Sequence, residues 1–284
     1  MNATAGHPAT VCLRRLLLAV VLATLPAIGP AGAEPPRRVV TVNLCLDQIA
    51  LRLAAPGQLV GVSFLATDPR LSAMAEQARR LPAVRASAES ILALQPDLVI
   101  VAKDQLGVVK SLLRRAGVPL LELPFAASLD EAEALVGEMG RALGREDAAR
   151  ALLDDMQAQR RALATPAQPV GVAAVLGANR ATAGRGSLMD QLLKLAGWRN
   201  LAADLGVGAY GRLPLEAVLA GQPDLLVLDG AANDSPARAT EFIDHHALVA
   251  LAGRARLASV PLRQTICAGP ENLEVVRRLA ELRR

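Results

Sequence analysis

One stretch that occurs twice sets the strongest constraint on the fold. Residues 89–101 read ESILALQPDLVIV and residues 216–228 read EAVLAGQPDLLVL, with Glu, Gln-Pro-Asp-Leu and an apolar run at the same internal spacing. In each copy the Glu opens a short amphipathic helix, which Pro96 or Pro223 ends because proline cannot extend a helix. The apolar run that follows predicts a buried strand. The repeat therefore predicts two copies of one helix–strand unit.

The first 33 residues predict an export signal that is not part of the fold. Arg14 and Arg15 precede an apolar segment at 16–28, and the stretch then ends in Ala-Gly-Ala. This pattern predicts a secretory signal peptide cleaved before Glu34 and a soluble, exported mature chain. A membrane anchor is the alternative, and the short apolar run disfavours it.

Composition excludes disorder and gives no support for nucleic-acid binding. Hydrophobic residues make up 52% of the sequence and charged residues 20%, which is enough for folded lobes with their own cores. Removal of Arg14 and Arg15 with the signal leaves 29 basic against 27 acidic residues, so no basic excess remains. The mature cysteines are Cys45 and Cys267, which in an exported protein permit one disulfide; two buried thiols are the alternative.

Apolar runs alternate with helical stretches along the mature chain, which predicts an α/β fold of two Rossmann-like lobes with mostly parallel sheets. The N-terminal lobe is expected at 34–125, a helical connector at 126–166 and the C-terminal lobe at 167–284. The second connector helix should be long and carry the chain between the lobes. The expected strands are 39–43, 59–62, 96–102, 118–123, 169–176, 224–229 and 256–261. Outside the connector and the repeat, the expected helices are 47–54, 104–116, 187–196, helices across 236–252, and one from residue 270.

A second similarity supports the duplication. Residues 47–60 and 190–202 both begin with Asp-Gln and continue as a Leu-rich helix. Open α/β sheets bind ligands at the carboxyl ends of their strands, so the loops that follow the strands should gather at one edge of each sheet. A ligand cleft between the lobes is the expected result.

Three motifs suggest other kinds of site, but the neighbouring sequence does not support any of them. Residues 206–211 match G-x-G-x-x-G, but no apolar strand precedes them, so they predict a flexible loop rather than a dinucleotide site. His245 and His246 are adjacent and point in different directions on a helix, which disfavours zinc. Ser187 lacks the G-x-S-x-G turn and a recognisable base. The sequence therefore predicts no catalytic set, no metal site and no cofactor.

Several longer segments resemble one known family. They are the signal peptide, VNLCLDQ at 42–48, the doubled Glu unit, GRLPLEAVLAGQPDLLVLDG at 211–230 and CAGPENLE at 267–274. Together they resemble the periplasmic binding proteins of ABC importers for metal chelates, which serve cobalamin, ferric siderophores and haem. The resemblance covers essentially the whole mature chain. It implies a periplasmic, non-enzymatic protein, expected to be monomeric, whose two lobes are joined by one long helix and clasp a small-molecule chelate.

The resemblance also implies a docking role for two glutamates. In this family one surface glutamate on each lobe pairs with arginines of the membrane permease, and the matching residues are Glu89 and Glu216, which open the two repeats. A dimeric permease offers two equivalent basic pockets, so a binding protein with two similar halves can present one carboxylate to each. For either residue alone, a charge favoured by the helix dipole is the alternative.

The ligand contacts are expected on the loops that follow the strands, where arginines can hold carboxylates or phosphates and aromatic rings can cover an apolar macrocycle. For each candidate alone, an ordinary solvated loop residue is the alternative. The candidates are Asn43, Cys45, Phe64, Lys103, Asp104 and Phe125 from the N-terminal lobe and Asn179, Arg180, Arg185, Tyr210, Arg212 and Arg263 from the C-terminal lobe.

The kind of chelate is ranked from the same loops. Aromatic residues make up only 2% of the sequence, Tyr210 is the sole Tyr and no His is expected in the cleft. A hydrophilic ferric siderophore is therefore ranked slightly ahead of cobalamin and well ahead of haem. Cys45 and Cys267 fall on cleft-side loops of opposite lobes, and a bond between them requires Cα atoms within about 7 Å. A periplasmic enzyme or a sensory adaptor on the same scaffold is the competing hypothesis.

Overall fold

The structure is a computed structural model that describes residues 34–163, 165–230, 251 and 253–283. From Pro35 onward the chain forms one compact unit. The predicted signal peptide and the two adjacent histidines lie outside the described residues, as does nearly all of the segment in which the helices across 236–252 are expected.

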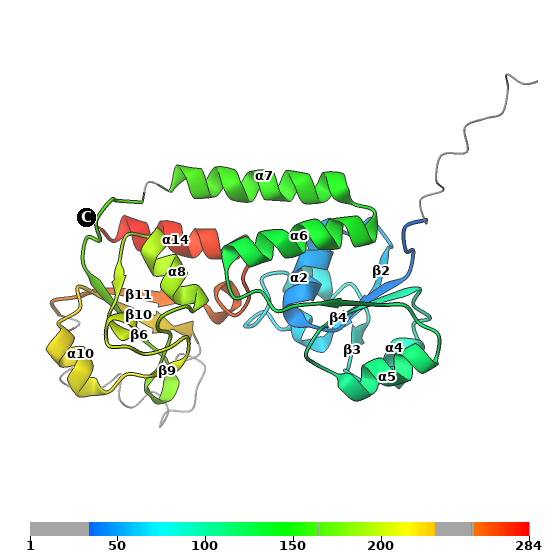
Figure 1. The fold of residues 1–284 in the computed structure, drawn as a ribbon, viewed down its shortest axis with the longest axis horizontal. Helices are drawn as coiled ribbons and strands as arrows, with labels where there is room; N and C mark the ends of the chain where they lie inside the picture. Colours follow the sequence, from blue (N-terminus) through cyan, green and yellow to red (C-terminus); the bar gives the residue numbers. More distant parts are fainter. Residues whose placement is uncertain (1–33, 164, 231–250, 252, 284) are drawn as a thin grey trace, which may run out of the picture. The chain divides into compact units, whose positions relative to one another are not determined.

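The first half of the chain builds a five-stranded sheet in the order β3-β2-β1-β4-β5, with every neighbouring pair parallel (Figure 1). Its strands are β1 (Val39–Thr41), β2 (Leu59–Ser63), β3 (Ala83–Val84), β4 (Leu98–Ala102) and β5 (Leu120–Leu123). The helices between them are α2 (Leu44–Leu53), η1 (Phe64–Thr67), α3 (Ala75–Ala78), α4 (Ala88–Leu92) and α5 (Gly107–Arg115).

Both faces of this sheet are covered, which explains why its strands read as continuous apolar runs. Val40 and Val99 face a cluster that includes side chains of α4 and α5. Their neighbours Val39 and Ile100 face the opposite cluster, which includes side chains of α2 and of the later helix α6 (Leu129–Leu143). Alternate residues of each strand are therefore buried against different helices.

The second half builds a four-stranded parallel sheet in the order β11-β10-β6-β8 and a small antiparallel pair, β7 with β9. The strands are β6 (Val172–Leu176), β7 (Ala181–Thr182), β8 (Arg199–Asn200), β9 (Gly211–Arg212), β10 (Leu225–Asp229) and β11 (Arg256–Val260). The helices are η2 (Ala178–Arg180), α8 (Leu188–Leu195), α9 (Leu201–Asp204), α10 (Leu215–Gly221), η3 (Leu262–Gln264) and α14 (Glu271–Glu281).

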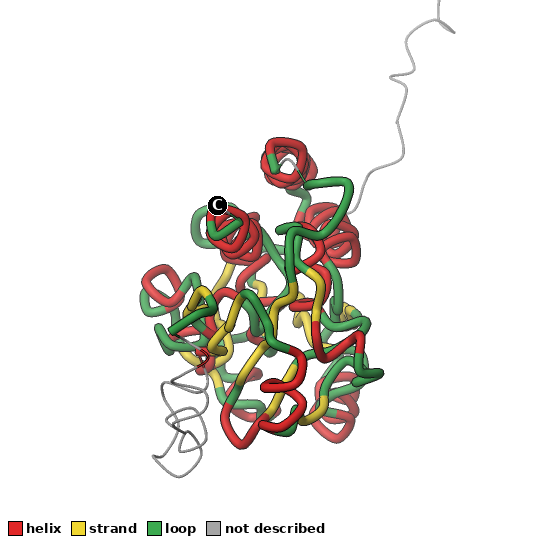
Figure 2. Tube along the Cα trace, turned by 90° about the vertical axis from the view of Figure 1, so that its left-hand side faces the viewer, coloured by secondary structure: helices red, strands yellow, loops and turns green. Residues whose placement is uncertain are grey.

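Two helices follow one another between the sheets, α6 and α7 (Glu146–Ala162), and they lie side by side (Figures 1 and 2). Ser128 caps α6 by accepting a hydrogen bond from the backbone N–H of Glu131 at 3.2 Å, and Gly144 ends it with a φ of 64°. A Cβ at Gly140 would overlap the side chain of Ala149, so this glycine allows α6 and α7 to pack closely. The two predicted helices are therefore present, while the lobe boundaries stay a prediction.

Each copy of the repeat starts its strand in the same way. The backbone N–H of Asp97 donates to Arg38 O at 3.0 Å, and the Asp97 carboxylate accepts the N–H of Arg38 at 2.9 Å. In the second copy the N–H of Asp224 donates to Val172 O at 2.8 Å, and its carboxylate accepts the N–H of Val172 at 2.9 Å. The repeated Asp thus joins the start of β4 to β1 and the start of β10 to β6.

The two halves are also linked by a covalent bond. Cys45 in α2 forms a disulfide with Cys267, which precedes α14, and their Cα atoms are 5.3 Å apart although 222 positions separate them in sequence. The predicted approach of these cysteines is confirmed. Arg52 is in the same helix as Cys45, and Glu271 lies four residues after Cys267 at the start of α14. Their side chains form an ion pair of 3.0 Å, which is a second link between α2 and this segment.

The prediction of a flexible loop at 206–211 is wrong in one respect, because part of this segment belongs to the β7–β9 pair. Gly211 pairs with Thr182 in the β7–β9 ladder, and the N–H of Gly184 donates to Gly208 O at 3.1 Å. The sequence analysis missed this pair because two-residue strands carry no periodic apolar signal. Gly206 has a left-handed backbone with a φ of 81°. A Cβ at Gly184 would overlap the backbone of Val207, so this glycine lets the two segments pack closely.

Candidate functional site

The parallel strands bring the N-terminal ligand candidates to one edge of the first sheet. Asn43, Phe64, Lys103 and Phe125 follow β1, β2, β4 and β5, which are neighbours in the sheet. The carboxyl ends of parallel strands meet at a common edge, so these four residues share it. Asp104 directly follows Lys103, and both side chains are exposed.

Asn43 holds the first of these loops in place. Its Oδ1 caps α2 by accepting hydrogen bonds from the backbone N–H groups of Cys45 and Leu46 at 3.0 and 3.2 Å. Its Nδ2 donates to Oε1 of Gln105 at 3.2 Å, which links the loop after β1 to the loop after β4. The sulfur of Cys45 is bonded to Cys267, so this candidate offers no thiol to a ligand.

Most of the described aromatic side chains are exposed at these loops. Phe64 is 50% exposed, Phe125 56% and Tyr210 79%, whereas Trp198 is 2% exposed and donates its Nε1–H to Leu279 O. Large aromatic side chains usually bury most of their surface, and exposed ones often mark a binding surface. The chain therefore presents three aromatic rings to solvent on loops where a ligand is expected.

The β7–β9 pair gathers three candidates of the C-terminal half. Arg212 lies in β9 opposite Ala181, and the carbonyl of Arg180 accepts the N–H of Leu213 at 3.0 Å. Tyr210 directly precedes β9. Arg180, Tyr210 and Arg212 are thus held on one small ladder, and all three are exposed.

Two further candidates lie near strand ends. Asn179 precedes Arg180 in η2, after β6, and both residues have left-handed backbones with φ of 55° and 63°. Such a conformation is uncommon for residues other than glycine and concentrates at functional loops. Arg263 is exposed in η3, after β11.

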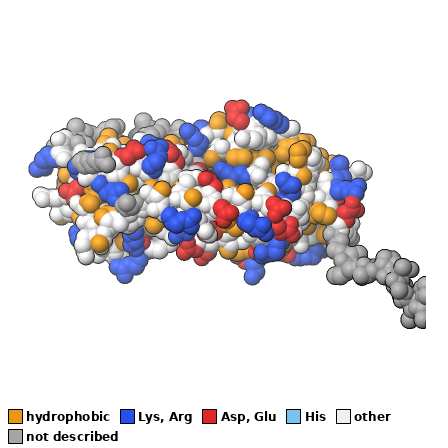
Figure 3. Space-filling model, turned by 90° about the horizontal axis from the view of Figure 1, so that it is seen from above, with side chains coloured by type: hydrophobic (Ala, Val, Ile, Leu, Met, Phe, Trp, Pro, Cys, Tyr) orange, Lys and Arg blue, Asp and Glu red, His pale blue; other side chains and the backbone are white. Residues whose placement is uncertain are grey.

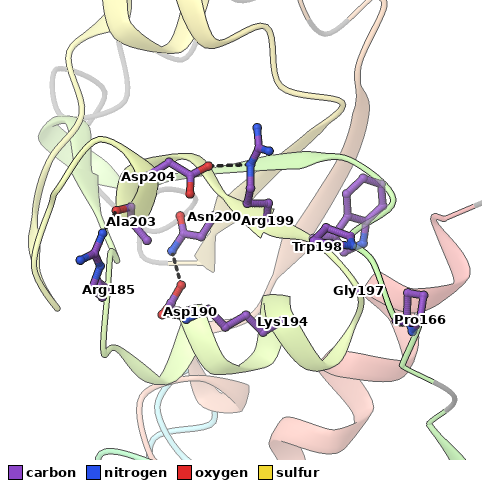
Figure 4. Close-up of a pocket in the computed structure, with 12 residues that line it drawn as sticks. Pro166, Arg185, Asp190, Lys194, Gly197, Trp198, Arg199, Asn200, Ala203 and Asp204 are labelled. Atoms are coloured by element: carbon purple, nitrogen blue, oxygen red, sulfur yellow. Dashed lines mark hydrogen bonds and ion pairs between the residues drawn. The ribbon is translucent and has the colours of Figure 1, made fainter.

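Arg185 follows the β7–β9 pair, where its backbone N–H donates to Val207 O at 2.9 Å, and it lines a pocket of about 410 Å³ between α8 and the β8–α9 segment (Figure 4). Its guanidinium donates to Ala203 O at 3.0 Å. The pocket is lined by Pro166, Ala167, Pro169, Arg185, Asp190, Lys194, Gly197, Trp198, Arg199, Asn200, Ala203 and Asp204.

The polar groups of this pocket mainly satisfy one another. The Asp190 carboxylate accepts hydrogen bonds from Nζ of Lys194 at 2.7 Å and from Nδ2 of Asn200 at 3.2 Å (Figure 4). Arg199 and Asp204 form an ion pair of 2.7 Å on the other wall. These bonds hold α8 against β8 at the sheet edge, and the ligand role of Arg185 stays a prediction.

A fully buried carboxylate lies beneath the first candidate loop. Asp47 in α2 is 0% exposed and accepts a hydrogen bond from the hydroxyl of Ser63 at the end of β2. Burial raises the pKa of the Asp47 carboxyl to about 6, and the Ser63 hydrogen bond offsets only part of this shift. Oδ1 of Asp47 and Oγ1 of Thr41 are buried without a hydrogen-bond partner in the described part of the chain.

Both predicted docking glutamates are on the surface. Glu89 stands in the first turn of α4 and Glu216 in the first turn of α10, and both side chains are exposed. Neither carboxylate forms an ion pair with another described residue. A carboxylate that lacks an internal partner is available to an external cation.

Other kinds of site find no support among the described residues. They hold no group of three or more His, Cys, Asp or Glu that could bind a metal ion, and none of their helices is long and apolar enough to cross a membrane. Ser187 caps α8, since its Oγ accepts the N–H of Asp190 at 3.1 Å and donates to Gly184 O at 2.8 Å. On the face in Figure 3, Lys and Arg are interspersed with Asp and Glu and form no continuous basic field.

The sequence matches the family model of the periplasmic binding proteins over residues 39–253. The chain belongs to this family. Among curated proteins, a cobalamin-binding protein of Halobacterium salinarum is 28% identical over 215 residues, which cover 73% of this chain. The chain spans 58% of the length of that relative.

Solved structures support the same assignment. The periplasmic haem-binding protein RhuT from Roseiflexus sp. RS-1 is 26% identical with a TM-score of 0.70, and the match covers 87% of this chain and 99% of RhuT. A periplasmic haem-binding protein from Pseudomonas aeruginosa is 25% identical with a TM-score of 0.68, covering 86% of this chain and 91% of that protein. Both of these proteins are named as periplasmic, which accords with the export predicted for this chain.

Proposed function

We propose that this chain is the substrate-binding component of an ABC importer. It captures a metal chelate in the periplasm and delivers it to a dimeric permease in the inner membrane. The observation that carries the delivery step is the pair of exposed glutamates at the same position of the two repeats, Glu89 and Glu216, which form no ion pair within the described part of the chain. Complementary charge on a permease would orient the protein and speed its association.

The docking step is tested by charge reversal. In the Glu89→Arg and Glu216→Arg double variant, we expect chelate-stimulated ATP hydrolysis by the reconstituted permease–ATPase complex to be lost, because arginine repels a basic pocket. Chelate affinity should stay within about twofold of wild type, since surface substitutions away from the ligand change free energies little. Wild-type stimulation by this variant would contradict the docking role.

For the ligand, we propose a metal tetrapyrrole of the cobalamin or haem type. The support comes from the three exposed rings of Phe64, Phe125 and Tyr210, because such flat chelates have apolar faces that aromatic side chains cover well. Exposed Lys103 and Arg212 can hold peripheral carboxylate or phosphate groups. The three relatives reported above are named as cobalamin- or haem-binding proteins, which supports this choice. The sequence analysis ranked a ferric siderophore ahead of cobalamin and haem because the chain has few aromatic residues. The proposal reverses that order because most of the described aromatic residues are exposed.

Titration of the purified protein with haemin, cyanocobalamin and a ferric hydroxamate siderophore tests this choice, with the absorption spectrum and native mass as readouts. The Phe64→Ala and Phe125→Ala variants should each weaken tetrapyrrole binding by about tenfold, since each removes an aromatic contact. Leu257→Ala is a matched control, because Leu257 is 54% exposed but lies on β11. Tight binding of the siderophore alone would contradict the proposal.

Tyr210 separates the two tetrapyrroles. A phenol oxygen can bind the iron of haem, whereas the ring alone can cover a corrin face. If the ligand is haem, Tyr210→Phe should shift the visible spectrum of the complex. If it is cobalamin, the same change should leave the spectrum and the affinity nearly unchanged.

A further inference from the structure

Asp47 is a fully buried acid that neither contacts a ligand loop from outside nor takes part in docking. Its side chain is 0% exposed, and it stands in the first turn of α2, which begins directly after Asn43. Its carboxylate accepts a hydrogen bond from the hydroxyl of Ser63, the last residue of β2. Burial of an ionisable group is costly, so the presence of an acid at this place requires a reason.

Ser63 connects this acid to one of the ligand loops. It is the N-cap residue of η1, but its side chain forms no capping hydrogen bond with η1, and its hydroxyl donates to Asp47 instead. Phe64 is the first residue of η1 and is 50% exposed. The way in which the chain leaves β2, and with it the position of the Phe64 ring, therefore depends on the bond between Ser63 and Asp47.

The second oxygen of the Asp47 carboxyl group lacks a partner. Oδ1 of Asp47 and Oγ1 of Thr41, at the end of β1, are both buried, and neither forms a hydrogen bond within the described part of the chain. The Thr41 hydroxyl still lies close enough to lower the pKa of Asp47. A neutral carboxyl group has a proton that it can donate toward Thr41, whereas ionisation buries a full negative charge. The surroundings therefore favour the neutral form, in agreement with a pKa of about 6.

No charged side chain among the described residues is placed to offset a negative charge on Asp47. The elements β1, β2, β4 and η1 contact α2 and contain no charged residue. On α2 itself Arg52 is paired with Glu271, and after η1 Arg70 is paired with Asp68. Helix α6 packs against α2 through apolar side chains (Figure 1). The charged residues of α6 and of the turn after it are not buried; they are Asp130, Glu131, Glu133, Glu138, Arg141 and Arg145.

We propose that Asp47 is a positioning residue for the chelate, which acts through Ser63 on the Phe64 loop and couples chelate binding to the uptake of a proton. The inference rests on the proposed capture of a chelate. A chelate that covers the Phe64 ring excludes water from this loop and from the site beneath it, which further disfavours the charged form of Asp47. Because linkage is reciprocal, protonation of Asp47 then favours binding of the chelate. Chelate affinity should therefore rise as the pH falls from 7.5 to 5.

The test compares the affinities of wild type and Asp47→Asn for haemin and cyanocobalamin at pH 5 and pH 7.5. The asparagine resembles the neutral acid, because its amide keeps an acceptor for Ser63 and offers a donor toward Thr41. Any pH dependence of the chelates themselves is common to both proteins. Relative to Asp47→Asn, wild type should lose affinity by about threefold between pH 5 and pH 7.5. The same pH dependence in both proteins would overturn the proposal.

Ser63→Ala distinguishes positioning from a purely structural role. This change removes the bond to the Phe64 loop but leaves Asp47 buried, so the free energy of unfolding should keep its dependence on pH. Chelate affinity should fall by about threefold or more, and its difference between the two pH values should shrink to that of Asp47→Asn. Ser111→Ala is the matched control, because Ser111 is exposed on α5. Affinities of Ser63→Ala that equal those of Ser111→Ala at both pH values would also overturn the proposal.

The same measurements separate this inference from the proposed function. If wild type binds neither haemin nor cyanocobalamin at either pH, the proposed ligand class fails and the inference fails with it. If wild type binds one of them with the pH dependence of Asp47→Asn, the inference alone fails. If Asp47→Asn does not fold, the comparison of Ser63→Ala with Ser111→Ala decides the question.

Discussion

At the scale of single residues, helices α2 and α8 each contain a buried aspartate followed by Gln, and the two carboxylates have different hydrogen-bond partners. Asp190 in α8 is paired with Lys194, one turn later at 2.7 Å, and with Asn200. Asp47 in α2 has Leu51 at the position of that lysine and relies on the hydroxyl of Ser63. Only α8 therefore has a lysine beside its aspartate, and burial of Asp47 without such a cation raises its pKa to about 6.

This difference predicts an unusual pH dependence. The pKa of Asp47 is raised from 3.8 to about 6, so between these values the folded state holds more protons than the unfolded state. The contribution of Asp47 to the free energy of unfolding must then fall as pH rises through this window. Between pH 4.5 and pH 7.5 we expect the free energy of unfolding of the wild type to fall by about 2 kcal/mol more than that of Asp47→Asn, because the asparagine in that variant cannot titrate. Denaturant unfolding of both proteins at the two pH values measures it.

The control for this effect is Asp154→Asn, because Asp154 is exposed on α7. Its difference from wild type should be nearly the same at both pH values. Parallel pH profiles for wild type and Asp47→Asn would contradict a raised pKa of Asp47.

At the scale of elements, the repeat has a structural reason that is independent of docking. Asp97 and Asp224 each bind the backbone of a neighbouring strand through both main chain and side chain, so they fix where β4 and β10 enter their sheets. The residues two positions earlier, Gln95 and Gln222, both have left-handed backbones, with φ of 47° and 40°. The chain thus makes the same turn in both copies before each strand begins.

We expect Asp97→Ala to lower the free energy of unfolding by about 1–2 kcal/mol, because the N–H groups of Arg37 and Arg38 lose their carboxylate acceptor. Asp97→Asn should cost less, since the amide keeps one oxygen that can accept. Thermal and denaturant unfolding measure the change. An effect of Asp97→Ala no larger than that of Asp154→Ala would show that the carboxylate does not anchor the strand.

The elements that the sequence predicted well are those with strong periodic signals. The strands at 59–62 and 224–229 and the capped helix after Ser128 appear within a few residues of their expected bounds. The β7–β9 pair and β8 were missed, because strands of two residues depend on tertiary contacts rather than on a pattern. Of the site, the strand-end loops could be predicted from topology. The exposure of Phe64, and the pocket around Arg185, could not, since both depend on how side chains from distant elements pack.

At the scale of the whole molecule, α2 is fastened to the segment that leads into α14. The disulfide Cys45–Cys267 lies there, and Arg52 and Glu271 form an ion pair whose side chains are 18% and 7% exposed. Asn272 is fully buried and holds the segment itself, since its Nδ2 donates to Cys267 O at 3.0 Å. These contacts join residues from the two ends of the chain, so they oppose separation of the first sheet from the last helix.

Loss of the disulfide should therefore affect both stability and local opening. A bond that closes a long loop restricts the unfolded chain strongly, so Cys45→Ser with Cys267→Ser should lower the free energy of unfolding by about 2–5 kcal/mol. Reductant should lower the stability of wild type to that of the double variant and leave the variant unchanged. Hydrogen exchange should rise first in α2 and at residues 262–274, because the disulfide joins these segments directly. If exchange rises equally across both sheets instead, the disulfide acts on the unfolded chain alone, and the fastening of α2 to α14 depends on the ion pair and on packing.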